Sequence, residues 1–195
     1  MNMEMQDIPP SHEDSLRLIS SMIETARKQI GDNGFHLLFW GWVTIVVSLL
    51  HYGLDVFTDY PHPYFAWFLM VPGSVVSFVY GYRRGKRSKV TTYTDRIMVW
   101  VWVTVIVSVV ITIAFLSYIN FQAVPIILLF AGNATFISGW LLRFRPVVIG
   151  GIMLWIGTIV AFLVPPAEQL LVEAIAVAFG YLIPGYFLRA HYKKQ

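Results

Sequence analysis

Long apolar stretches without any charged residue limit what this chain can fold into. No charge occurs between Asp32 and Asp55, between Asp59 and Arg83, between Arg96 and Arg143, or between Arg145 and Glu168. A helix that crosses the hydrocarbon core of a bilayer needs about 20 predominantly apolar residues, and each stretch is long enough to supply one. Only 13% of the residues are charged, whereas about a quarter are charged in a typical soluble domain. A bilayer is therefore the expected solvent.

The positions of these stretches predict six membrane-spanning helices. The longest stretch is divided by Asn120, Gln122 and Pro125, so it has room for two spans. The predicted spans cover residues 35–54, 64–82, 97–118, 124–142, 147–164 and 170–188. They form an all-α, polytopic helix bundle over residues 34–195, preceded by a cytoplasmic N-terminal segment over residues 1–33.

Basic residues predict the orientation of the bundle. All fourteen lysines and arginines lie before the first predicted span or after an even-numbered one. The charged residues assigned to the opposite loops are all acids, namely Asp55, Asp59, Glu168 and Glu173. Because lysine and arginine beside a span are retained in the cytoplasm, both termini are expected to be cytoplasmic.

A short motif recurs in the first and third predicted spans. Residues 40–48 and 100–108 both fit W-x-W-V-T-x-x-V-S, and a weaker echo begins at Trp155. This similarity predicts a parallel repeat of three helical hairpins related by an axis along the membrane normal, a plan found in transporters. Chance convergence is the alternative, since these residue types are common in spans.

The N-terminal segment contains one amphipathic pattern, over about residues 12–31. Its apolar positions recur every three or four residues and form a seam of Leu16, Ile19, Ile23, Ala26 and Ile30. A seam about two heptads long is marginal as an isolated coiled coil. It is therefore expected to be buried, either against the bilayer surface and the protein's own loops or against a protein partner or second copy.

Polar side chains within the spans are candidates for helix contacts or for a solute path. They are Thr44, Ser48, Thr104, Ser108, Asn133, Thr135 and Ser138. An amide or hydroxyl in hydrocarbon needs a hydrogen-bond partner, and a neighbouring helix is the usual one. Lining a path is the alternative. The sequence places no acid, lysine or arginine near a span centre, which disfavours a charged substrate.

Two further clusters lie at the predicted membrane surfaces. At the outer one, the candidates for a zinc or other divalent metal site are His51, Asp55, Asp59 and His62, although such residues are also ordinary at an interface. At the inner one, the basic residues expected to contact anionic lipid headgroups are Arg83, Arg84, Lys86, Arg87 and Lys89. This loop is too short for a nucleic-acid-reading module.

Catalytic signatures are missing from the sequence. There is no cysteine, no GxSxG or HExxH motif and no phosphate-cradling glycine loop. We therefore expect no cofactor, no metal and no enzymatic activity.

Two segments resemble other proteins. They read S-L-R-L-I-S-S-M-I-E-T-A-R-K over residues 15–28 and G-F-H-L-L-F-W-G-W over residues 34–42, and five further spans follow. This order resembles small uncharacterised bacterial inner-membrane proteins with six spans and a cytoplasmic N-terminal helix. The resemblance implies a bacterial inner-membrane location and no particular activity.

The function expected from these features is a non-enzymatic accessory, regulatory or scaffolding role, with association through the cytoplasmic helix. A small transporter or channel for a neutral or weakly polar solute is the alternative, and a membrane enzyme is the third.

Overall fold

The computed structural model describes residues 34–58, 60–87 and 93–193, and these residues form only helices and turns. Within them, six helical segments are long and apolar enough to cross a membrane: Phe35–Phe57, Pro63–Arg83, Tyr93–Ala114, Ala123–Leu141, Arg145–Leu163 and Pro166–His191. The predictions of an all-α protein and of six spans are thereby confirmed. The predicted cytoplasmic helix lies outside the described residues.

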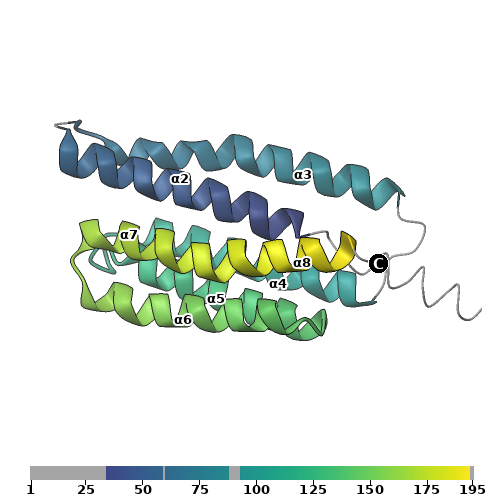
Figure 1. Ribbon diagram of the computed structural model, residues 1–195. Coiled ribbons are helices and arrows are strands. Elements are labelled where there is room, and N and C mark those ends of the chain that lie inside the picture. Colours follow the sequence, from purple (N-terminus) through teal and green to yellow (C-terminus); the bar gives the residue numbers. More distant parts are fainter. Residues whose placement is uncertain (1–33, 59, 88–92, 194–195) are drawn as a thin grey trace, which may run out of the picture.

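Successive spans run in opposite directions along a common axis (Figure 1). The helical elements are α2 (Phe35–Phe57), η1 (Pro63–Leu69), α3 (Met70–Arg87), α4 (Tyr93–Ala114), α5 (Ala123–Leu141), α6 (Arg145–Leu163), α7 (Pro166–Val177), η2 (Ala178–Leu182) and α8 (Ile183–Lys193). This alternation brings Arg83, Arg143 and Arg189 to one end of the bundle, called the basic end below. Asp55 and Glu168 lie at the other, called the acidic end.

The core is built by four of the six spans. α5 packs most extensively against α6, and α7 packs against both α2 and α6. The central cluster consists of Leu128, Leu154, Ala161, Ala176, Val177 and Tyr181. In the most apolar part of the sixth span 56% of residues are buried, against 11% in the second span and 6% in the third. α3 and α4 therefore lie at the periphery.

Glycines allow the backbones of α5 and α6 to touch. A Cβ atom at Gly151 would lie 2.7 Å from the backbone nitrogen of Phe136, and one at Gly139 would lie 2.5 Å from that of Val148. On the other side of α6, a Cβ atom at Gly157 would clash with the Cβ atom of Ala176 on α7. Small residues at this contact allow the last two spans to approach closely.

The third span ends four residues before its predicted boundary. α4 stops at Ala114, and residues 115–121 form turns in which Asn120 and Phe121 have φ angles of 51° and 61°. The Phe121 amide donates to the Leu116 carbonyl over 3.1 Å. This turn is rich in aromatic and aliphatic side chains, so hydropathy did not distinguish it from the helix.

Pro184 changes the winding of the sixth span. The residues before it form the π-helical segment η2, in which the Ile183 amide donates to the Ala178 carbonyl five residues back. Proline has no amide hydrogen and its ring crowds the preceding turn, so a wider turn accommodates it. Pro72 lies in the first turn of α3, directly after the 3-10 helix η1.

The two copies of the tryptophan motif have different surroundings. Ser48 on α2 donates a hydrogen bond to Glu173 on α7, whereas Ser108 on α4 donates to the Thr104 carbonyl of its own helix. Trp40 of the first copy, which corresponds to Trp100 of the second, donates to Ser77 on α3 over 3.2 Å. The matched positions therefore make different contacts, and the hairpin repeat stays a prediction.

Candidate functional site

A buried carboxyl group lies within the sixth span. Glu173 on α7 is 2% exposed, and the fully buried Ser48 on α2 donates a hydrogen bond of 2.8 Å to its Oε2 atom. The prediction that Glu173 belongs to the outer loops with the other acids is wrong, because Glu173 lies within α7. Glu173 follows Pro166 by seven residues, which corresponds to a depth of about 10 Å along the helix. The signal was present, because Glu173 falls inside the predicted span 170–188.

A second buried polar contact lies one helical turn toward the acidic end. Gln169 is 1% exposed, and its Nε2 atom donates to Oε1 of Gln122 over 2.6 Å. The same atom reaches the Val164 carbonyl at 3.5 Å. Residues four apart share a helix face, so Gln169 and Glu173 project in the same direction from α7.

Further polar groups continue toward the basic end. Tyr181 on η2 is buried, and its side chain is a neighbour of both Thr135 on α5 and Glu173 on α7. Thr135 also donates to the Ala131 carbonyl over 2.7 Å. Ser138, one turn further along α5, is buried, and its hydroxyl has no hydrogen-bond partner among the described residues.

These groups occupy successive levels inside the bundle, and we call them the buried polar series. Its members are Gln122, Gln169, Glu173, Ser48, Tyr181, Thr135 and Ser138. Three were candidates from the sequence, and the other four were not. The series is assembled from α2, α5, α7 and η2, so no single segment of sequence displays it.

Three of the remaining polar candidates, Thr104, Ser108 and Asn133, lie elsewhere, in a groove between α4 and α5. A cavity of about 140 Å³ is lined by Val101, Thr104, Val105, Ser108, Phe130, Asn133, Ala134 and Ile137. Asn133, Thr104 and Ile137 are exposed, so this α4–α5 groove opens at the side of the bundle. Thr44 does not line it. The predicted polar residues are thus divided between two places, with Thr44 in neither.

The polar side chains that line the α4–α5 groove have hydrogen-bond partners for some of their polar groups. The hydroxyls of Thr104 and Ser108 donate to carbonyls of their own helix, over 2.7 and 2.8 Å. Oδ1 of Asn133 accepts a bond of 3.0 Å from Nε1 of Trp155 on α6. This contact is of the interhelical kind predicted for the amide, and it uses only the oxygen.

The histidine and aspartate candidates at the acidic end have other contacts. Nδ1 of His51 accepts a bond of 2.9 Å from the Trp67 indole, and Nδ1 of His62 lies 2.9 Å from the Tyr64 hydroxyl. Asp55 is exposed, and Asp59 lies outside the described residues. Among residues that the structure describes, no three histidine, cysteine or acidic side chains are grouped to hold a metal ion.

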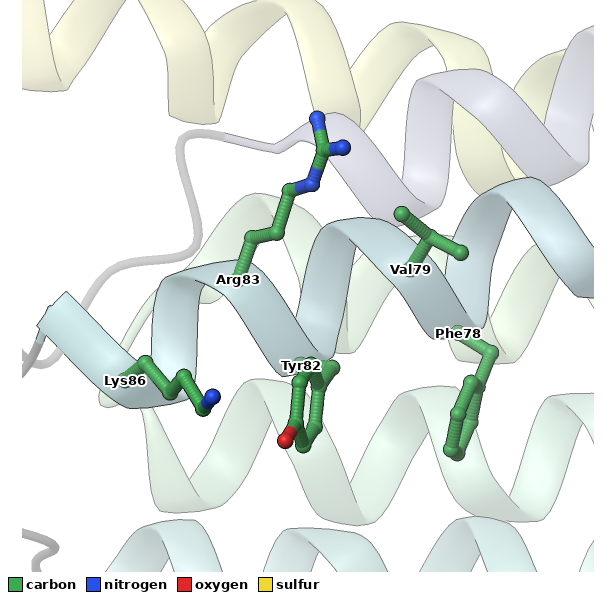
Figure 2. Close-up of a pocket in the computed structure, with 5 residues that line it drawn as sticks. All are labelled: Phe78, Val79, Tyr82, Arg83 and Lys86. Atoms are coloured by element: carbon green, nitrogen blue, oxygen red, sulfur yellow. The ribbon is translucent and has the colours of Figure 1, made fainter.

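The basic end of α3 borders an open hollow (Figure 2). It has a volume of about 490 Å³ and is lined by Phe78, Val79, Tyr82, Arg83 and Lys86. The rings of Phe78 and Tyr82 are stacked at 6.4 Å, and the Lys86 ammonium lies 4.9 Å from the centre of the Tyr82 ring. The side chains of Arg84, Arg87 and Lys89 lie outside the description, so contact with anionic lipid stays a prediction.

Comparisons with known proteins leave the family open. No family model, no curated protein and no solved structure matches the chain. The seam of residues 16–30, which carries the predicted association, lies outside the residues that the structure describes. The structure and composition show a multi-span helical membrane protein.

Proposed function

We propose that this protein is a non-enzymatic accessory or scaffolding component of a bacterial inner membrane and works by self-association. The observation that carries the proposal is Asn133, an amide on the exposed side of the bundle in the middle of α5. Hydrocarbon offers an amide no hydrogen bonds, so exposed Asn133 favours contact with another protein surface. Trp155 contacts only the oxygen, so the nitrogen donors of Asn133 are available as far as the described residues are concerned.

A second copy of the chain fits this groove by its chemistry. A carboxamide is both donor and acceptor, so two Asn133 side chains related by a two-fold axis satisfy one another. The groove is narrow, but α4 beside it is barely buried, which leaves its flank free for a neighbouring subunit. Contact through the cytoplasmic seam would extend the same association outside the membrane.

The solute-path alternative receives less support from this geometry. A path through the membrane requires side chains from several helices around an enclosed space. The α4–α5 groove is lined by two helices only, and it opens sideways. A docking surface explains its position at the edge of the bundle more directly.

Cysteine cross-linking in membranes tests the proposal, and the chain has no native cysteine to interfere. Ile137→Cys places a thiol on the exposed rim of the groove. We expect this variant to form a disulfide-linked dimer under mild oxidation. Adding Asn133→Leu should weaken association about tenfold, since an interhelical polar contact contributes about 1–2 kcal/mol.

Ile159→Cys is the matched control, because Ile159 is also an exposed isoleucine, 63% exposed against 43% for Ile137, but lies on α6. It should remain monomeric under the same oxidation. Equal cross-linking at both positions would indicate random collision, and a dimer unaffected by Asn133→Leu would remove the amide from the interface. In a parallel variant with Ile19 and Ile23 changed to aspartate, loss of the dimer would show that the cytoplasmic seam contributes.

The proposed orientation, with both termini in the cytoplasm, rests on the separation of basic and acidic ends. A cysteine at exposed Glu168 should react with an impermeant thiol reagent in intact cells. One at Ser88 should react only after the cells are permeabilised. The neighbouring Gln169 is unsuitable as a reporter because it is 1% exposed. The reverse labelling pattern would invert the orientation.

A further inference from the structure

Glu173 has no counter-charge within reach in the described parts of the chain. Its hydrogen bond comes from a neutral hydroxyl, that of Ser48. α5 contains no titratable residue, and the only one on α6, Arg145, is the first residue of that helix at the basic end. On its own span the nearest cation is Arg189, sixteen residues or about 24 Å along the helix.

The remaining titratable groups around Glu173 are few. On α2, His51 is one turn beyond Ser48 and accepts a bond from Trp67, and Tyr52 follows it. Asp55 is exposed at the acidic end of α2, and His36 lies near the basic end. On η2 the neighbour is Tyr181, a neutral phenol. Among the residues that the structure describes, no positive side chain is therefore placed to pair with a carboxylate at this position.

Burial without a counter-charge favours a carboxyl group that holds a proton. An isolated ionised carboxylate in an apolar interior is far less stable than the neutral acid. A neutral acid can still take part in the observed contact with Ser48, since it has both a donor and an acceptor.

The surrounding groups are suited to proton exchange as well as to structure. Toward the acidic end, Gln169 and Gln122 supply amides, and toward the basic end Tyr181, Thr135 and Ser138 supply hydroxyls. Ser138 is a buried hydroxyl with a free hydrogen-bonding position in the described structure. Acids within spans are characteristic of proton relays.

We propose that Glu173 is a membrane-embedded proton-binding site whose proton exchanges along the buried polar series. This site is separate from the α4–α5 groove, so it does not depend on self-association.

Dicyclohexylcarbodiimide, an apolar reagent that partitions into membranes, tests whether Glu173 is a neutral acid. The carboxylic acid adds across one C=N bond: its proton goes to nitrogen, and its oxygen bonds to carbon to give an O-acylurea. Rearrangement to the stable N-acylurea needs no further reactant and adds the whole reagent mass to the side chain. Mass spectrometry of the labelled full-length protein then locates the modified residue.

We expect Glu173 to be modified in native membranes, and its labelling to decline as the medium is made alkaline. Exposed Glu168, five residues earlier on the same helix, is the internal comparison and should be labelled at least about tenfold less. A water-soluble carbodiimide with an added amine should reverse this preference. Glu173→Gln should abolish the main modification, whereas Glu168→Gln should leave it unchanged.

Infrared spectroscopy of the unmodified protein tests exchange independently of the reagent's access. The parent should show a carbonyl band of a neutral carboxylic acid that shifts when H₂O is replaced by D₂O, and Glu173→Gln should lack it. A parent without this band, or with a band that does not shift, would overturn the proposal. Sodium-dependent protection from the carbodiimide at constant pH would also overturn it, in favour of a metal-cation site.

Discussion

Replacing Gly151 with alanine should destabilise the folded bundle by about 2–3 kcal/mol, because overpacking a tight contact has this effect. A Cβ atom at this position would lie 2.7 Å from the backbone nitrogen of Phe136 and 2.8 Å from its Cα atom. Backbone atoms cannot rotate away as a side chain can, so α5 and α6 would have to separate. Circular dichroism during thermal unfolding in detergent would measure the change.

Gly81→Ala is the matched control for this prediction. Gly81 is also helical, but a Cβ atom there would have no neighbour within 4 Å. Because glycine is less favourable than alanine in a helix by about 0.5–1 kcal/mol, this variant should be slightly more stable than the parent. Equal stability of the two variants would show that the α5–α6 contact can relax and that our packing argument is wrong.

Replacing Glu173 with lysine should destabilise the bundle by about 3–5 kcal/mol, the range measured when a buried charge is left without a partner. An ammonium group has three donors, whereas the Ser48 hydroxyl has two acceptor lone pairs and no charge to offset the ammonium. We expect a lower unfolding temperature and more aggregated protein after extraction. The readout is the monodisperse fraction by size exclusion, followed by thermal unfolding.

Glu168→Lys makes the same chemical change five residues earlier, on an exposed side chain. Its effect should stay within about 0.5 kcal/mol, as is usual for surface substitutions. If both lysine variants unfold at the parental temperature, the interior around Glu173 admits enough water to solvate a charge. The buried polar series would then be a hydrated path rather than a dry contact.

The acidic residues show where prediction from sequence succeeded and where it failed. Glu168 was assigned to the outer loops and does lie exposed at the acidic end, whereas Glu173 was assigned there and is 2% exposed. Because a helix has 3.6 residues per turn, Glu168 and Glu173 project from different faces of the same helix. The helical period alone does not say which of these faces packs against a neighbouring helix. In a span that is apolar on all sides, the position of the core is hard to read from composition.

Ser48 and Ser108 make the same point with identical local motifs. Both follow W-x-W-V-T, yet Ser48 is fully buried against Glu173, and Ser108 faces the α4–α5 groove. Their roles differ because α2 packs against α7 whereas α4 packs against α5.

The sequence by itself determined the number of spans and the separation of basic from acidic ends. The number of spans follows from the hydropathy summed over about 20 consecutive residues, because each residue of a span contributes separately to the free energy of its transfer into hydrocarbon. The separation of the two ends follows from the count of basic residues in each loop. Only the tertiary structure decided that Ser48 meets Glu173, that Asn133 lies in a side groove with Thr104, and that the third span ends at Ala114. These features depend on which helix faces are in contact, and such contacts join residues as far apart in the chain as positions 48 and 173.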